Sequence, residues 1–202
     1  MTVSNLKYPA SETSLSKEAI SWEVFEKDYL TREDEWKYEW VDGIIEKTKR
    51  VMYPYQYHIL YNLRQLFRGL FNKGKVSGSF EAETDVFLTN KIHRRPDISY
   101  FTKEQVAQMG HGQTAIPEFV VEVVSKTDLH VKQNLKMKNY REAGVKVVWQ
   151  IFSETEEVEA TRGRASIIKS GNEICSASPV LPDFKISVKD IFKKIPLADA
   201  DD

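Results

Sequence analysis

Two segments in the first half of the chain carry apolar residues at helical spacing. Trp22, Phe25 and Tyr29 predict a short amphipathic helix. A longer amphipathic helix is predicted to begin at Pro54, because proline fits the first turn of a helix. Its apolar positions are Ile59, Leu63, Leu66, Leu70 and Phe71.

Other segments have the apolar pattern of strands. The runs "KYEWV" and "IIEKTKR" flank an Asp-Gly pair that is typical of hairpin turns, so Glu39 and Glu46 are expected on two adjacent strands. Residues 75–89 and 95–102 alternate as strands do, with Asp97 at the head of the second. Residues 156–170 predict a hairpin at a sheet edge, and "SVKDIF" predicts one closing helical turn.

A buried strand, a helix and a second apolar strand follow one another between residues 117 and 153. Thr127 or Asp128 can cap the helix and Gly144 can end it. This order predicts a crossover unit in which the two strands are parallel. The first strand, "PEFVVEVVS", contains Glu122 among valines, where an unpaired carboxylate would be costly.

Composition indicates one packed domain with appended ends. The 202 residues are 41% hydrophobic and 29% charged, with a formal net charge of -1. We expect a loose arm over residues 1–18, one domain over 19–193 and a disordered acidic tail over 194–202. A single cysteine, Cys175, excludes an internal disulfide framework. Because neither a signal peptide nor a long apolar span is recognisable, no membrane contact and a cytoplasmic location are expected.

Asp97 and Glu122 are candidates for a metal site. Their separation leaves room for one strand to end and the next to begin, so the two carboxylates are expected side by side. Two neighbouring anions repel, and a divalent cation stabilises both. Oxygen ligands favour Mg²⁺ or Mn²⁺ over zinc. Taken alone, however, Asp97 after a proline is more typical of a turn, and Glu122 would also suit a buried ion pair.

The segments "YEWVDGIIE", "RPDISYF", "EFVVEVVSK", "NLKMKNYREAGV" and "VVWQIF" together resemble the PD-(D/E)XK nuclease superfamily. More closely, they resemble its Uma-type restriction endonuclease-like family. The resemblance covers about residues 38–149 and implies an α/β fold with a mixed central β-sheet flanked by helices. It also implies that Asp97 and Glu122 are metal ligands and that Glu39 completes the metal shell.

The chain departs from the superfamily pattern at one position. Val124 stands where a catalytic lysine is usual, two residues after Glu122. By resemblance to the Uma-type family, the catalytic lysine is Lys136, four residues before Tyr140 and on the same helix face. Lys126 is the rival, because strand alternation places it on the same face as Glu122.

The resemblance implies a Mg²⁺-dependent endonuclease acting on DNA. The alternative is an inactive nucleic-acid-binding or regulatory protein on the same fold. Basic residues on the predicted helix, together with "HRR" (93–95) and "KTKR" (47–50), are candidates for a phosphate-binding rim; the alternative is that these charge runs are only solvated faces. A homodimer would place two clefts against two strands of a duplex, although no sequence pattern indicates one.

Overall fold

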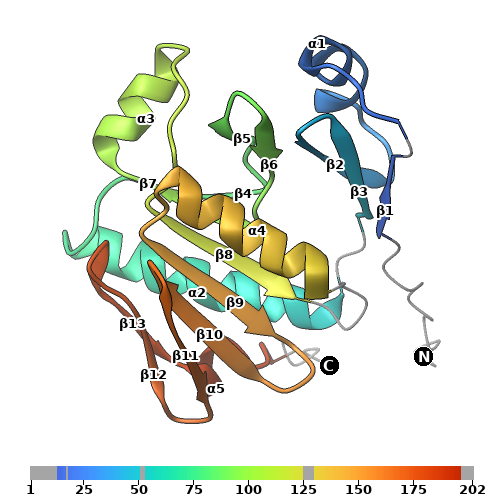
Figure 1. The fold of residues 1–202 in the computed structure, drawn as a ribbon. Coiled ribbons are helices and arrows are strands. Elements are labelled where there is room, and N and C mark those ends of the chain that lie inside the picture. The colour runs from blue at the N-terminus through green and yellow to red at the C-terminus, as the bar shows by residue number, and fades with distance from the viewer. Residues whose placement is uncertain (1–12, 17, 51–52, 125–129, 197–202) are drawn as a thin grey trace, which may run out of the picture.

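The computed structural model describes residues 13–16, 18–50, 53–124 and 130–196. Its centre is a six-stranded sheet in the order β11-β10-β9-β8-β7-β4 (Figure 1). β8 and β9 are parallel and the other neighbouring pairs are antiparallel, so the sheet is mixed as predicted. The strands are β4 (Ser79–Ala82), β7 (Ile98–Phe101), β8 (Phe119–Val124), β9 (Val147–Phe152), β10 (Glu157–Arg162) and β11 (Ala165–Ser170).

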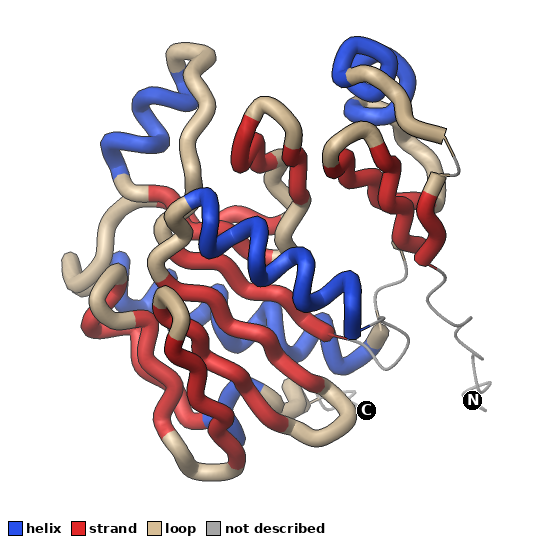
Figure 2. Tube along the Cα trace, viewed as in Figure 1, coloured by secondary structure: helices blue, strands red, loops and turns tan. Residues whose placement is uncertain are grey.

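Two helices cover opposite faces of this sheet (Figures 1 and 2). Helix α2 (Pro54–Asn72) packs Ile59, Leu63 and Phe67 in one apolar cluster with the odd-numbered residues of β8. Helix α4 (His130–Ala143) packs Tyr140 against Val120 in a second cluster. Because successive strand residues point to opposite faces, Glu122 lies on the α4 face. The predicted α/β fold with a mixed, helix-flanked sheet is confirmed.

A second sheet has the order β1-β3-β2-β6-β5. Its strands are β1 (Thr13–Leu15), β2 (Trp36–Val41), β3 (Ile44–Lys49), β5 (Val86–Thr89) and β6 (Ile92–Arg94). The predicted hairpin is confirmed, with Asp42 and Gly43 at φ values of 46° and 90°. Its register sets Glu39 directly opposite Glu46. The predicted first helix is also found, as α1 (Trp22–Phe25) continued by a π-helical turn over Glu26–Leu30.

One prediction about the strands needs correction. The single strand expected over residues 75–89 is two strands, β4 and β5, that belong to different sheets. The chain changes direction between them at Glu83, whose φ is 48°. Within the predicted loose arm, Thr13–Leu15 forms β1 and pairs with β3. At the other end, Ile195 of the predicted tail donates its backbone N–H to Nδ1 of His58 in α2 at 3.2 Å.

The remaining elements surround the central sheet. α3 (Lys103–Gly110) and the hairpin of β12 (Ile174–Ala177) and β13 (Leu181–Ser187) were not predicted from the sequence. The hairpin over β10 and β11 and the closing helix α5 (Val188–Ile191) are confirmed. Within the described part of the chain, none of the helices is long and apolar enough to cross a membrane.

Candidate active site

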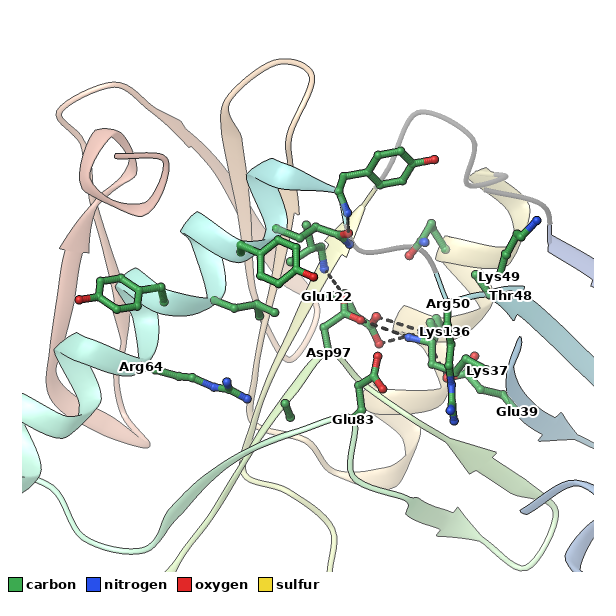
Figure 3. Close-up of a pocket in the computed structure, with 18 of the residues that line it drawn as sticks. Lys37, Glu39, Thr48, Lys49, Arg50, Arg64, Glu83, Asp97, Glu122 and Lys136 are labelled. Carbon is green, nitrogen blue, oxygen red and sulfur yellow. Dashed lines mark hydrogen bonds and ion pairs between the residues drawn. The ribbon is translucent and has the colours of Figure 1, made fainter. Parts of the chain in front are cut away.

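Five side chains from both sheets and from α4 meet in one groove with a volume of about 920 Å³ (Figure 3). They are Lys37 and Glu39 of β2, Asp97 before β7, Glu122 of β8 and Lys136 of α4. β7 and β8 are antiparallel with Ile98 opposite Val121. Extending that register by one residue sets Asp97 opposite Glu122. The structure therefore brings the two predicted carboxylates side by side on adjacent strands.

Glu122 is held by two side chains of α4. Its carboxylate lies 3.0 Å from Nζ of Lys136 at both oxygens, and it accepts a hydrogen bond from the hydroxyl of Tyr140. The residue is only 4% exposed. Lys136 and Tyr140 occupy successive turns of one helix face, as their spacing predicted. A lysine and a tyrosine therefore explain how a strand of valines accommodates a carboxylate.

Lys136 also contacts the second sheet. Its Nζ atom lies 3.2 Å from Oε1 of Glu39. Burial disfavours the ammonium, but the carboxylates of Glu122 and Glu39 outweigh this effect and raise the pKa of Lys136. Lys136 is therefore a fixed positive charge between two strands that carry carboxylates.

Asp97 is positioned by a backbone amide and by a second lysine. Its Oδ2 atom accepts the backbone N–H of Val123 at 2.7 Å, which ties it to the residue after Glu122. Its Oδ1 atom lies 3.2 Å from Nζ of Lys37. Despite burial, the carboxylates of Asp97, Glu122 and Glu39 raise the pKa of Lys37. Lys37 was missed in the sequence, although alternation places it on the same strand face as Glu39.

The buried carboxylates differ in how readily they ionise. Burial raises the pKa of Glu122, and the neighbouring Asp97 and Glu39 add to this against the opposing charges of Lys136 and Lys37. Burial acts in the same direction on Glu39, but Lys136, Arg94 and Lys37 lower its pKa well below the ordinary value. Glu39 is thus the more firmly anionic of the two.

Glu39 belongs to a second buried network. Arg94, which is fully buried, donates from Nη1 to Glu39 at 3.1 Å and to Glu46 at 2.9 Å. Its other guanidinium nitrogens donate to Oδ1 of Asn139 in α4 at 2.7 and 3.2 Å. The backbone N–H of Arg95 donates to Glu39 at 2.8 Å. Both oxygens of Glu39 are therefore engaged, and metal ligation by Glu39 stays a prediction.

The prediction of a phosphate-binding rim is wrong for "HRR", whereas two residues of "KTKR" remain candidates for it. His93, Arg94 and Arg95 are all buried, and Arg95 pairs with Asp85 at 2.6 Å, so these residues serve internal ion pairs. Lys49 and Arg50, in contrast, line the groove. His93 and Arg94 lie on β6, an interior strand of the second sheet, and Arg95 follows it, so their side chains face partners inside the protein and not solvent. Lys126, the rival catalytic lysine, lies outside the described residues.

Asp97 and Glu122 form a donor set that suits a hard divalent cation. In the described ranges, no group of three or more His, Cys, Asp or Glu side chains is arranged to hold a metal. Mg²⁺ does not need such a cage, because it retains several waters and binds one or two carboxylates together with substrate phosphates. Two adjacent carboxylates that open into a groove fit this mode of binding.

Comparison with known proteins identifies the family. The family described as "Putative restriction endonuclease" (Uma2) matches residues 22–189. The crystal structure of a putative nuclease belonging to DUF820 from Anabaena variabilis has the same fold, with a TM-score of 0.72 and 17% sequence identity. The match covers 86% of this chain and 97% of that chain. A search of curated proteins gave no match. The chain belongs to the Uma2 family of putative restriction endonucleases.

Proposed function

We propose that this chain is an endonuclease that uses Mg²⁺ or Mn²⁺ to hydrolyse phosphodiester bonds of DNA. The observation that carries the proposal is the meeting of Asp97, Glu122 and Lys136 in one groove, with the lysine 3.0 Å from Glu122. The family match supports nuclease chemistry. In this proposal, Asp97 and Glu122 hold the cation and Lys136 is the catalytic lysine.

The cation, when bound, polarises a phosphoryl oxygen and lowers the pKa of water. Lys136 contributes a positive charge beside the carboxylates, where negative charge develops on the phosphoryl group during hydrolysis. Because its pKa is raised, Lys136 stays an ammonium and acts by donating hydrogen bonds to the attacking water or to the phosphate. In hydrolysis the water oxygen bonds to phosphorus and the water loses a proton, while the bond from phosphorus to the leaving oxygen breaks and that oxygen gains a proton.

Glu39 acts through Lys136 in this proposal. Its carboxylate contacts the lysine from β2 of the second sheet, and Arg94 holds Glu39 in turn. Lys37 balances the charge of Asp97 before a cation binds. Lys136 and Lys37 thus compensate the negative charge of the buried carboxylates, which would otherwise destabilise the folded protein.

The test is nicking of supercoiled plasmid with Mg²⁺ or Mn²⁺ by wild type, Asp97→Asn and Glu122→Gln. Loss of one electrostatic group of this kind typically lowers the rate by ~10²–10³. Glu118→Gln is the matched control, since Glu118 is an acidic residue beside β8 whose partner is Lys146. Equal nicking by all four proteins would overturn the proposal. Circular dichroism of each variant separates loss of chemistry from loss of fold.

A second candidate, a catalytically inactive nucleic-acid-binding or regulatory protein, is favoured by one observation. Lys37 and the Val123 N–H engage both oxygens of Asp97, and Lys136 and Tyr140 engage Glu122, so the carboxylates are stabilised within the protein. Calorimetric titration with Mn²⁺ separates the two candidates. The endonuclease requires Mn²⁺ binding that Asp97→Asn weakens, whereas the inactive protein shows no binding.

A further inference from the structure

One wall of the groove carries exposed aromatic side chains. Tyr57 and Tyr61 of α2 both line the groove and are 60% and 46% exposed. Residues four apart on a helix lie on one face, about 5–6 Å apart at Cβ. The core side of α2 is formed by other residues, among them Ile59 and Leu63, so the helix does not need the two tyrosines for its own packing.

Positive charges flank these tyrosines and the carboxylates. Arg64 follows one turn after Tyr61 on the same wall of the groove. Lys49 and Arg50 lie on the opposite side, and Asp97 and Glu122 lie between the two sides (Figure 3). A polyanionic strand that follows the arginines and Lys49 would pass over the carboxylates with its bases beside the α2 wall. Aromatic rings combined with a basic groove are typical of sites for single-stranded nucleic acid.

We propose that the groove binds a single-stranded or locally unpaired nucleic-acid strand, with bases stacked on Tyr57 and Tyr61 and phosphates directed to Arg64 and Arg50. The inference rests on the proposed nuclease function, because it names the substrate class of the same groove. Every base presents an aromatic face, so this binding has little sequence preference.

An intact duplex does not satisfy this arrangement. Inside a duplex each base face is covered by its neighbours, so a tyrosine ring reaches a base only at an end, a gap or an unpaired position. Basic side chains alone would bind a duplex through its phosphates. Tyr57 and Tyr61 would then contribute nothing to the affinity. The tyrosines therefore distinguish the unpaired strand from the duplex.

The experiment measures fluorescence anisotropy of a labelled oligonucleotide at low salt in EDTA, where a metal-dependent nuclease does not cut. One sequence is offered as single-stranded DNA, as single-stranded RNA and as blunt duplex DNA. We expect wild type to bind at least one single strand about tenfold more tightly than the duplex. Comparing the DNA and RNA strands identifies the sugar that the groove accepts.

The variants test the tyrosines themselves. Tyr57→Ala and Tyr61→Ala should each weaken single-strand binding by roughly tenfold, whereas Tyr57→Phe retains the ring and most of the affinity. Phe71→Ala is the matched control, because Phe71 is an aromatic residue of α2 that is 51% exposed and does not line the groove. Weak duplex binding should change little in any of these variants.

Three outcomes overturn the inference: equal affinity for single strand and duplex, no binding of either, or tyrosine variants that match Phe71→Ala. Failure of the nuclease proposal looks different. If the plasmid is nicked but the tyrosine variants bind single strands normally, only the substrate inference falls. If single strands bind through the tyrosines but no cation supports cleavage, the groove assignment stands and the nuclease proposal falls.

Discussion

Lys37 and Asp97 are 60 positions apart in the chain, yet the Nζ atom of the lysine lies 3.2 Å from Oδ1 of the aspartate. The pair connects β2 of one sheet to the start of β7 in the other. Its ammonium occupies one side of a carboxylate that we propose as a metal ligand. A divalent cation and Lys37 would therefore compete electrostatically for Asp97.

This competition predicts the effect of Lys37→Met. Removing the ammonium leaves Asp97 and Glu122 with less positive charge nearby, so Mn²⁺ should bind about tenfold more tightly or better in calorimetry. Lys91→Met is the control, because Lys91 is an exposed lysine that pairs with Asp42 away from the groove. Unchanged or weaker Mn²⁺ binding by Lys37→Met would contradict a competition between Lys37 and the cation for Asp97.

The Lys136–Glu122 pair predicts that substitutions of the two residues have non-additive effects on the free energy of unfolding. Lys136→Met leaves a buried carboxylate without its cation and should lower the free energy of unfolding by about 3 kcal/mol. Adding Glu122→Gln removes the stranded charge and should recover much of that loss. Urea denaturation of both single variants and the double variant measures the coupling.

Lys138→Met is the control for this cycle, since Lys138 is an exposed lysine of the same helix whose pair with Glu142 contributes little. Strictly additive effects of Lys136→Met and Glu122→Gln would argue against a direct buried interaction.

Arg94 is predicted to matter for folding more than for chemistry. Arg94→Met leaves Glu39 and Glu46 opposite each other and buried without the guanidinium between them. The expected loss of stability is about 3–5 kcal/mol. Arg94→Lys should not restore wild-type stability, because an ammonium cannot reproduce the planar set of bonds to the carboxylates and Asn139. A urea midpoint within error of wild type for either variant would be the contrary result.

Cys175 is predicted to be unreactive while the protein is folded. Burial raises the pKa of its thiol to about 11, above the ordinary value of 9.0. Only the thiolate attacks alkylating reagents, so at about pH 8 the folded protein should react with iodoacetamide roughly a hundredfold more slowly than the urea-unfolded chain. Mass spectrometry of the modified peptide gives both rates. Rapid labelling of the native protein would show that the hairpin of β12 and β13 opens.

Sequence patterns predicted the parts of the fold that depend on local order. The crossover from β8 through α4 to β9 follows from a strand, a helix and a strand in succession, and Asp42-Gly43 specifies its hairpin. The break at Glu83 was not predictable in this way. Residues 75–89 alternate throughout, and only the pairing partners, β7 for β4 and β6 for β5, assign the two halves to different sheets.

The candidate site, like the fold, was predictable only where neighbouring residues in the sequence carry the pattern. Asp97 and Glu122 were singled out from their separation in the chain and Lys136 from the resemblance to the Uma-type family, and the register of β7 with β8 brings the two carboxylates together. Arg94 was misjudged, because three consecutive basic residues look solvated in a sequence. Its burial depends on Glu39, Glu46 and Asn139, which come from three other elements. Contacts between distant elements leave no local pattern.

Diffraction from a crystal soaked in Mn²⁺, with data collected for the anomalous signal of manganese, tests whether Asp97 and Glu122 together hold a divalent cation. We predict one anomalous peak that marks a Mn²⁺ ion coordinated by a carboxylate oxygen of Asp97 and one of Glu122. We also expect Nζ of Lys37 to be displaced from Asp97. A fully soaked crystal without a peak, in which Lys37 still contacts Asp97 and Lys136 still contacts Glu122, would contradict the claim.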